Sequence, residues 1–142
     1  MTVTPADNVS DHAPASVKRE GRAGWRERWQ RVVQTRIWGM TIDRSARIAP
    51  TALIDRTWPT GIHIGAECHI GEEAVILTHD RTRGLYLDTY IGDRTIVGPR
   101  AIVLPGITVG ADCVIEPGAL VRTDMPDRSV ARGNPAKVEP RD

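Results

Sequence analysis

A run of aliphatic residues at six-residue spacing constrains the fold of this chain more than any other feature of its sequence. From Ile91 to Val121 every sixth residue is Ile or Val, a period that neither an α-helix nor an ordinary β-strand produces. The residue four positions after each of the first five is also small or apolar. The two sets are Ile91, Val97, Val103, Val109, Ile115 and Val121, and Thr95, Ala101, Ile107, Cys113 and Ala119. Such a repeat predicts a parallel β-helix, in which three hexads close one triangular coil.

Two insertions interrupt the same repeat earlier in the chain. The repeat starts at Ile42 and resumes at Ile64 after residues 56–61 (RTWPTG), and a second break, residues 77–84, precedes a restart that we expect at Leu85. The sequence therefore predicts about four and a half coils over residues 42–124, with the insertions standing out as loops from one face. Glycine follows three of the anchors, at Gly92, Gly98 and Gly110, where we expect it to let the backbone turn without a Cβ clash.

The composition agrees with a narrow, all-β interior. Apolar residues make up 40% of the 142 residues, aromatic residues only 4%, and Phe is absent, as expected for a coil too slender to hold many rings. Both cysteines, Cys68 and Cys113, occupy the small inward position of a hexad, so we expect buried thiols that act as core residues. The formal charge of +1 gives no argument for a nucleic-acid partner.

The segment before the repeat has a helical period. Residues 1–17 are polar and aperiodic and are expected to be a mobile leader, whereas Trp25, Trp29, Val33 and Ile37 recur every four residues and predict an amphipathic helix over 18–38. Seven Lys or Arg side chains against two Glu give residues 18–37 a formal charge of +5. The helix could therefore contact an anionic membrane. The interpretation that we favour places its Trp stripe over the open end or flank of the β-helix, because a solenoid needs a cap.

The rest of the chain carries two further expectations. Residues 125–142 are rich in Pro and Gly, so we expect a tail that leaves the coil and runs along its outside. No apolar run reaches the roughly 18 residues of a spanning helix, and the first residues lack the apolar core of a signal peptide. A cytoplasmic protein is the expectation, with the inner face of the membrane as the alternative location.

The second insertion is the best candidate for chemistry. It carries residues 78–81 (THDR), and His79 lies on an inserted loop, where an imidazole can take a proton from a hydroxyl. His12 lies in the leader, while His63 and His69 directly precede strand anchors and are expected to point outward from adjacent faces.

Longer motifs resemble a known family. The run IGDRTIVGPRAIVLPGITVGADCVIEPGALVRTDMPDRSVARGNPAKV and the upstream ILTHD are similar to segments of the hexapeptide-repeat acetyltransferases. The resemblance extends over about residues 42–138 and is strongest to the colanic-acid, nodulation-factor and maltose-type sugar O-acetyltransferases.

The resemblance implies a fold, an assembly and an activity. It implies a homotrimer of left-handed parallel β-helices, with acetyl-coenzyme A lying between subunits as acyl donor and a sugar or polysaccharide precursor as acceptor. It assigns His79 as the general base of a direct transfer and Asp80 to the substrate site, and it implies no metal. Whether the carboxylate of Asp80 or of Asp88 orients the imidazole stays open. The positions that it assigns to the coenzyme groove are Gly98, Pro99, Arg100, Pro117, Arg122, Thr123 and Lys137.

Three positions depart from the family pattern. Ile96 replaces a common Trp, and Ala119 replaces a common Ser. Pro99 lies where relatives often offer a backbone N–H to the oxyanion, and proline has no such donor, so the amide of Gly98 or Arg100 would have to serve.

Two other functional classes fit the same fold. A γ-type carbonic anhydrase would need His63, His69 and His79 to converge on zinc, although the spacing places the first two on adjacent faces. A non-catalytic β-helix scaffold would have no need of the imidazole on the inserted loop.

Overall fold

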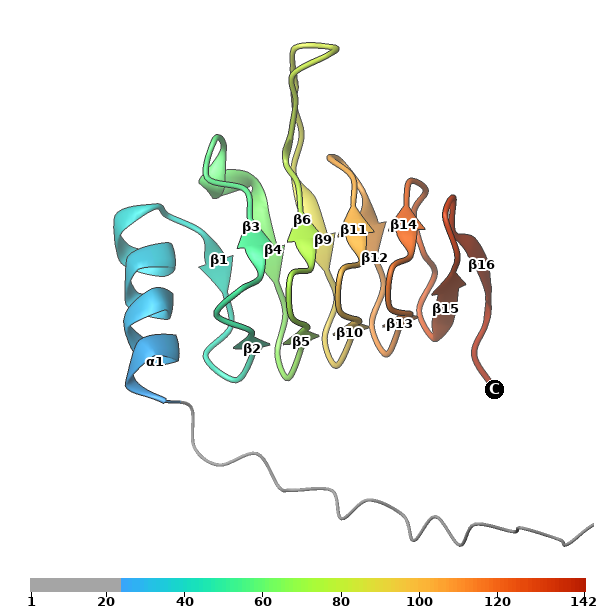
Figure 1. Cartoon of the computed structure of the whole chain (residues 1–142), viewed down its shortest axis with the longest axis horizontal. Coiled ribbons are helices and arrows are strands. Elements are labelled where there is room, and N and C mark those ends of the chain that lie inside the picture. Colours follow the sequence, from blue (N-terminus) through green and yellow to red (C-terminus); the bar gives the residue numbers. More distant parts are fainter. Residues whose placement is uncertain (1–23) are drawn as a thin grey trace, which may run out of the picture.

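The computed structural model describes residues 24–142 and shows a parallel β-helix with three faces (Figure 1). Face A contains β1 (Thr41–Ile42), β4 (Ile62–Ile64), β9 (Thr89–Ile91) and β12 (Thr108–Val109). Face B contains β2 (Arg47–Ile48), β5 (His69–Ile70), β10 (Ile96–Val97), β13 (Val114–Ile115), β15 (Ser129–Arg132) and β16 (Lys137–Pro140). Face C contains β3 (Leu53–Ile54), β6 (Val75–Ile76), β11 (Ile102–Val103) and β14 (Leu120–Val121).

The six-residue anchors form the core, as the sequence predicted. On face B, Ile70 pairs in register with Val97, and Val97 with Ile115, so that anchors of successive coils stack in one column. All three are fully buried, and the small positions such as Ala101 and Cys113 are buried with them. Because successive side chains of a strand point to opposite sides, each two-residue strand of the coil contributes a single aliphatic side chain to a narrow core.

The glycines after the anchors are needed for close approach between coils and not for the turn itself. A Cβ on Gly98 would lie 2.6 Å from the backbone nitrogen of Pro117 in the next coil. The left-handed backbone conformation occurs two residues later, at Arg94, Arg100 and Asp112, with φ of 56°, 57° and 55°. The expectation that these glycines supply the turn was therefore wrong, because the neighbouring coil fills the space of their side chain.

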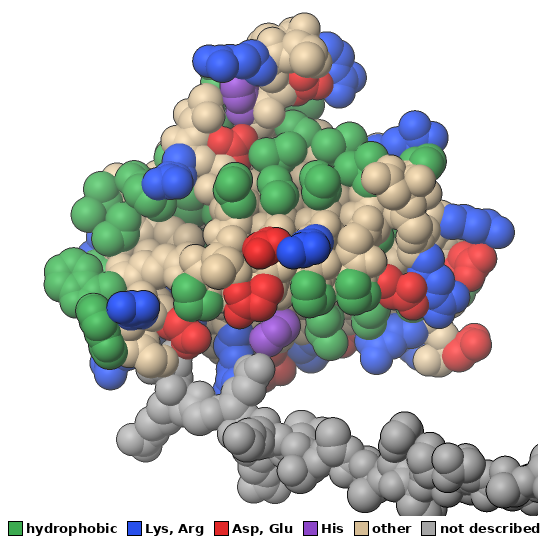
Figure 2. Space-filling model, in the orientation of Figure 1, with side chains coloured by type: hydrophobic (Ala, Val, Ile, Leu, Met, Phe, Trp, Pro, Cys, Tyr) green, Lys and Arg blue, Asp and Glu red, His purple; other side chains and the backbone are tan. Residues whose placement is uncertain are grey.

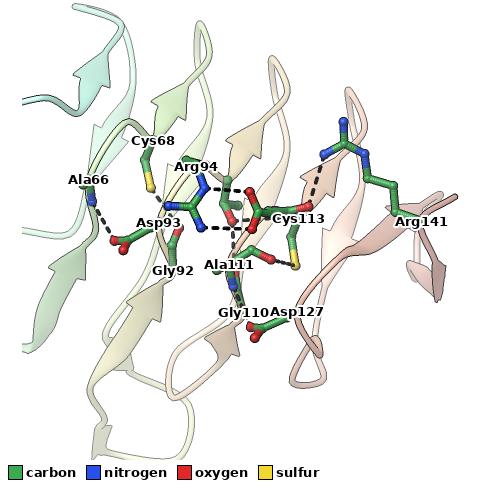
Figure 3. Close-up of polar contacts among 12 residues, drawn as sticks. Ala66, Cys68, Gly92, Asp93, Arg94, Gly110, Ala111, Cys113, Asp127 and Arg141 are labelled. Carbon is green, nitrogen blue, oxygen red and sulfur yellow. Dashed lines mark hydrogen bonds and ion pairs between the residues drawn. The ribbon is translucent and has the colours of Figure 1, made fainter.

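Polar contacts hold the edge between faces A and B, hereafter the A–B edge (Figure 3). Asp93 accepts a hydrogen bond from the backbone N–H of Ala66 at 2.8 Å, and Arg94 pairs with both carboxylate oxygens of Asp112 at 2.8 and 3.0 Å. Cys68 and Cys113 are free, buried thiols near this edge that contact backbone carbonyls, and burial raises the pKa of Cys68. Their expected role as small core residues is confirmed.

Both insertions leave the coil at the edge between faces C and A, hereafter the C–A edge (Figure 1). The first contains the 3-10 turn η2 (Pro59–Gly61), and the second is an antiparallel hairpin of β7 (His79–Asp80) and β8 (Leu85–Tyr86). Leu85 lies on this hairpin and is 39% exposed, so the expected restart of the repeat at Leu85 was wrong. The repeat resumes on β9, whose anchor is Ile91.

The N-terminal helix packs differently from the favoured expectation. It comprises α1 (Trp25–Val32) and a π-helical turn, η1 (Val33–Ile37), and it lies at the first coil (Figure 1). Within these two elements the side chain of Gln34 is buried, whereas those of Trp25 and Trp29 are 70% and 64% exposed. The Trp stripe therefore covers neither the open end nor the flank of the coil. The predicted leader and the predicted start of the helix at residue 18 lie outside the described residues.

The C-terminal segment remains part of the coil longer than expected. β15 pairs parallel with β13 as an additional strand of face B, and β16 turns back antiparallel to β15 at the end of the sheet. Within this C-terminal segment, only β16 runs antiparallel to the strands of the coil. The folded-back β16 covers the hydrogen-bonding edge that β15 would otherwise expose.

Candidate active site

The hairpin at the C–A edge carries His79 clear of the coil. Its backbone is fixed from the preceding coil by Asp55, which follows the last anchor before the first insertion. One carboxylate oxygen of Asp55 accepts hydrogen bonds from the backbone N–H groups of Thr78 and His79, each at 3.0 Å. The other oxygen accepts from the N–H of Thr57 at 2.8 Å. A single buried carboxylate thus connects the two insertions.

The environment of Asp55 favours its ionised form. Burial raises the pKa of the Asp55 carboxyl, but hydrogen bonds from Thr78, Thr57 and His79 oppose burial and outweigh it. The pKa therefore lies below the ordinary value, because a carboxylate that accepts several backbone N–H bonds is stabilised as an anion.

The imidazole of His79 packs against one ring of a small aromatic cluster. The ring centroid of Tyr86, on the paired strand β8, lies 4.9 Å from that of His79, and the Trp58 ring from the first insertion lies 5.0 Å from Tyr86. His79 is partly exposed, and Tyr86 leaves 48% of its surface exposed. An imidazole positioned by packing and open to solvent on one side can exchange a proton with a bound hydroxyl.

Neither of the expected carboxylates orients the His79 ring among the described residues. Asp80 instead closes the hairpin, accepting from the hydroxyl of Thr82 at 2.5 Å and from Nε of Arg83 at 2.6 Å. The Thr82 hydroxyl and the Arg83 side chain hold the pKa of Asp80 well below its usual range. A contact between Asp80 and substrate remains a prediction.

Asp88 lies beside a different histidine. Its Oδ2 is 3.5 Å from Nε2 of His63, and the imidazole of His63 stacks on Tyr90 with ring centroids 4.3 Å apart. Nε2 is buried and makes no hydrogen bond among the described residues. Asp88 thus interacts with face A and not with the hairpin imidazole.

Five of the predicted coenzyme residues gather along the edge between faces B and C, hereafter the B–C edge. Gly98, Pro99 and Arg100 form one corner of it, and Pro117 forms the corner of the next coil, where the N–H of Gly118 donates to the Pro99 carbonyl at 2.9 Å. Lys137 begins β16 directly after the turn that follows β15. These residues of successive coils therefore lie in one line parallel to the axis of the β-helix.

The remaining coenzyme residues lie elsewhere. Arg122 and Thr123 follow β14 and belong to the C–A edge, two coils beyond the hairpin. His79 and the B–C edge are thus separated by face C within one chain.

The two amides expected to replace Pro99 are already engaged. The N–H of Gly98 donates to the Ile115 carbonyl at 2.7 Å, and the N–H of Arg100 donates to the Glu72 carbonyl at 2.9 Å. Both bonds join neighbouring coils, so neither amide is available to an oxyanion without breaking the ladder. The guanidinium of Arg100 pairs with Glu73 at 2.7 Å on the exposed surface.

The histidines do not converge. His63 lies on face A, His69 on face B and His79 on the hairpin. Within residues 24–142, no group of three or more His, Cys, Asp or Glu side chains is arranged to hold a metal ion.

Three residues of the site escaped the sequence reasoning: Asp55, Trp58 and Tyr86. The available signal was that Asp55 and Trp58 flank or occupy the first insertion, RTWPTG, which leaves the coil at the same edge as the hairpin. Two insertions separated by one full coil leave the coil at the same edge. This rule could have predicted that residues of the first insertion lie beside the hairpin.

Comparison with known proteins identifies the repeat. Residues 88–123 match the family described as bacterial transferase hexapeptide (six repeats). The "Putative acetyltransferase YvoF" of Bacillus subtilis (strain 168) is 30% identical over 101 residues, which are 70% of this chain and 59% of that protein. Serine acetyltransferase 4 of Arabidopsis thaliana is 34% identical over 107 residues, 72% of this chain and 30% of that protein. The chain thus spans between 30% and 59% of the length of these relatives.

Solved structures share the fold. A maltose O-acetyltransferase from Clostridium difficile 630 superposes with a TM-score of 0.57 at 23% identity, over 85% of this chain and 79% of that one. A galactoside acetyltransferase in complex with coenzyme A superposes with a TM-score of 0.59 at 18% identity, over 83% of this chain and 72% of that one. The β-helix is accordingly of the left-handed hexapeptide type, and the resemblance seen in the sequence is confirmed.

Proposed function

Because this chain is a hexapeptide-repeat protein similar to acetyltransferases, we propose that it moves an acetyl group from acetyl-coenzyme A to a hydroxyl of a sugar or polysaccharide precursor. The observation that carries the proposal is the hairpin that holds His79, partly exposed, outside the coil. His79 lies on the edge that carries both insertions, where Asp55 binds its backbone N–H and Tyr86 packs against its imidazole.

His79 serves as general base in this mechanism. Its imidazole takes the proton of the acceptor hydroxyl as that oxygen attacks the thioester carbonyl, and the C–S bond then breaks. The departing sulfur recovers the proton from the imidazolium, so the products are an acetyl ester and the free thiol, with no acyl-enzyme. The oxyanion is held by a backbone N–H other than those of Gly98 and Arg100, since both are occupied.

A complete site requires neighbouring copies of the chain. His79 and the B–C edge flank face C from opposite sides, and one chain cannot bring them together. In a trimer whose three-fold axis passes beside face C, the C–A edge of one subunit meets the B–C edge of the next. The outward residues of face C fit this arrangement, because Leu53, Val75, Ile102 and Leu120 pair in register as one aliphatic column. Figure 2 shows a row of hydrophobic side chains over the strands of this face.

The groove between subunits would hold the coenzyme. Arg122 and Lys137 are exposed cations that can contact its phosphates, as charge-assisted hydrogen bonds favour. Lys137 would have to exchange its contact with Glu139, at 3.4 Å, for the coenzyme, and the exposed Arg100 would have to exchange its contact with Glu73. Gly98, Pro99, Pro117 and Thr123 would supply the surface of the groove.

In this proposal the acceptor would lie beside the aromatic cluster of the hairpin. Tyr86 exposes half of its surface next to His79, and an aromatic face packs well against the C–H face of a sugar ring. The similarity to a serine acetyltransferase makes the hydroxyl of serine the second candidate acceptor.

The test is acetyl-coenzyme A turnover, followed by thiol release, against sugars, polysaccharide fragments and L-serine under the same conditions. The proposal predicts release with at least one sugar acceptor and none above background with L-serine. If thiol is released with L-serine alone, the chain is an acetyltransferase whose acceptor is serine and not a sugar. If calorimetry detects no binding of the coenzyme, the proposed coenzyme groove is wrong.

A further inference from the structure

The N-terminal helix presents an apolar face that the coil leaves uncovered. Trp25, Trp29, Val32 and Ile37 are 70%, 64%, 46% and 69% exposed, which are high values for side chains of this size. Two contacts hold the other side of the helix to the first coil. Arg31 donates to the backbone carbonyls of Arg44 and Ala46, and Gln34 is buried. The helix is thus anchored through polar side chains, with its apolar side turned to solvent.

Arginines lie on this same exposed surface. Trp25, Arg28, Trp29 and Val32 line one open hollow of about 300 Å³, and the guanidinium of Arg26 lies 5.6 Å from the centroid of the Trp25 ring. Figure 2 shows hydrophobic and basic side chains side by side at the end of the molecule where α1 lies. Between residues 24 and 37 four arginines stand against one acidic residue, Glu27.

We propose that this Trp–Arg face, defined by Trp25, Arg26, Arg28, Trp29 and Val32, binds the surface of a bilayer rich in anionic phospholipid. Tryptophan is suited to the headgroup level, where its apolar ring is buried and its N–H remains hydrated. Exposed arginines beside it contribute attraction to anionic lipid, so the two residue types act on one surface. None of the helices in residues 24–142 is long and apolar enough to cross a membrane.

The charge of the helix argues against a second copy of the same helix as the occupant. Pairing two Trp–Arg faces would bring Arg26 and Arg28 of one copy against those of the other, and like charges across a contact are unfavourable. An anionic surface neutralises them instead. For the proposed transferase, this contact would bring the hairpin to acceptors carried by lipid, but membrane binding can be measured without any activity.

The experiment is co-sedimentation of the full chain with vesicles of phosphatidylcholine alone or mixed with phosphatidylglycerol. Binding is expected only to the mixed vesicles and should weaken as salt is raised. Arg26→Glu with Arg28→Glu should weaken it at least about 25-fold, at about fivefold per lost positive charge, whereas Arg26→Lys with Arg28→Lys should retain it. Trp25→Ala with Trp29→Ala should reduce binding to the level of pure phosphatidylcholine, with an unchanged unfolding temperature.

Three results would overturn the proposal. The first is absence of binding to mixed vesicles, and the second is equal binding by the Trp variant and the native chain. The third is a change in the solution mass of the Trp variant, which would make the face an interface between copies.

Discussion

The backbone N–H of His79 donates to the carboxylate of Asp55 at 3.0 Å, and this contact ties the hairpin to the preceding coil. The same carboxylate oxygen accepts from Thr78, so two consecutive amides at the start of the hairpin share one acceptor. Asp55 touches no reacting group in the proposed mechanism. It acts through His79 as a positioning residue, since it determines where the hairpin leaves the coil.

Asp55→Asn should lower kcat about ten- to hundredfold, because a small displacement of a catalytic group is costly. The side-chain amide of asparagine has one oxygen that accepts hydrogen bonds. Its NH2 group would therefore face a backbone N–H of Thr57 or of the hairpin, and the hydrogen bond at that position would be lost. KM for acetyl-coenzyme A and the pH at which kcat is half-maximal should remain unchanged, since the base itself is retained. Steady-state kinetics over a range of pH would check this.

Asp93→Asn is the matched control, because Asp93 accepts a backbone N–H at 2.8 Å on the A–B edge, away from the hairpin. It should lower stability without lowering kcat. If the two variants lost the same fraction of kcat, a positioning role for Asp55 would be untenable.

Asp55 should also make stability depend on pH in a defined direction. Its pKa is lower in the folded chain than in the unfolded chain, so the unfolded chain binds the proton more tightly. The stabilisation is complete above the unfolded value of about 4 and is lost as pH falls through the folded value. Denaturant unfolding of the native chain and Asp55→Asn should therefore differ at pH 7 and converge in acid. A difference that persisted unchanged in acid would contradict this explanation.

Gly98→Ala should destabilise the coil even without coenzyme. The added Cβ would lie 2.6 Å from the nitrogen of Pro117 and 2.8 Å from the carbonyl oxygen of Ile115, and both belong to backbone. Overpacking of this kind costs about 1–3 kcal/mol, whereas Pro99→Ala at the exposed neighbouring position should cost less than about 1 kcal/mol. Chemical denaturation of both variants would test this, and equal unfolding free energies would show that the coils can separate locally.

Ile102→Arg should dissociate the proposed trimer. Ile102 pairs with Val75 and Leu120 in the centre of the aliphatic column, so an arginine there would place a charge in the subunit interface. Light scattering should give the mass of three chains for the native protein and of one for the variant, with an unchanged circular dichroism spectrum. Thr108→Arg, on exposed face A, should leave the mass unchanged. A native mass of one chain would exclude a site built between subunits.

The coil could be predicted because the residue type that each of its strands needs recurs at a fixed interval in the sequence. One inward aliphatic side chain per strand repeats every six residues, and Ile70, Val97 and Ile115 satisfy it in adjacent coils. The length of the hairpin could not be obtained in the same way. Leu85 is aliphatic like an anchor, and only the pairing of His79 with Tyr86 shows that it belongs to a hairpin.

Other features depend on contacts that leave no local pattern. Asp55 binds backbone N–H groups 23 and 24 residues away, and backbone amides have no signature in the sequence. The period of Trp25 and Trp29 predicts one apolar stripe but not whether it faces the coil or solvent. In the structure, Arg31 binds the first coil from the other side of the helix, where Gln34 is buried, and the Trp stripe faces solvent.

The most direct test of the proposed activity compares thiol release from acetyl-coenzyme A by the native chain and by His79→Ala, with an acceptor that supports turnover. Loss of a general base should lower kcat by about 10² to 10⁴, with coenzyme binding by calorimetry unchanged. Arg94→Ala, which removes an exposed ion pair on the A–B edge, should retain the native rate. Equal rates for His79→Ala and the native chain would contradict the assignment of His79 and, with it, the proposed mechanism.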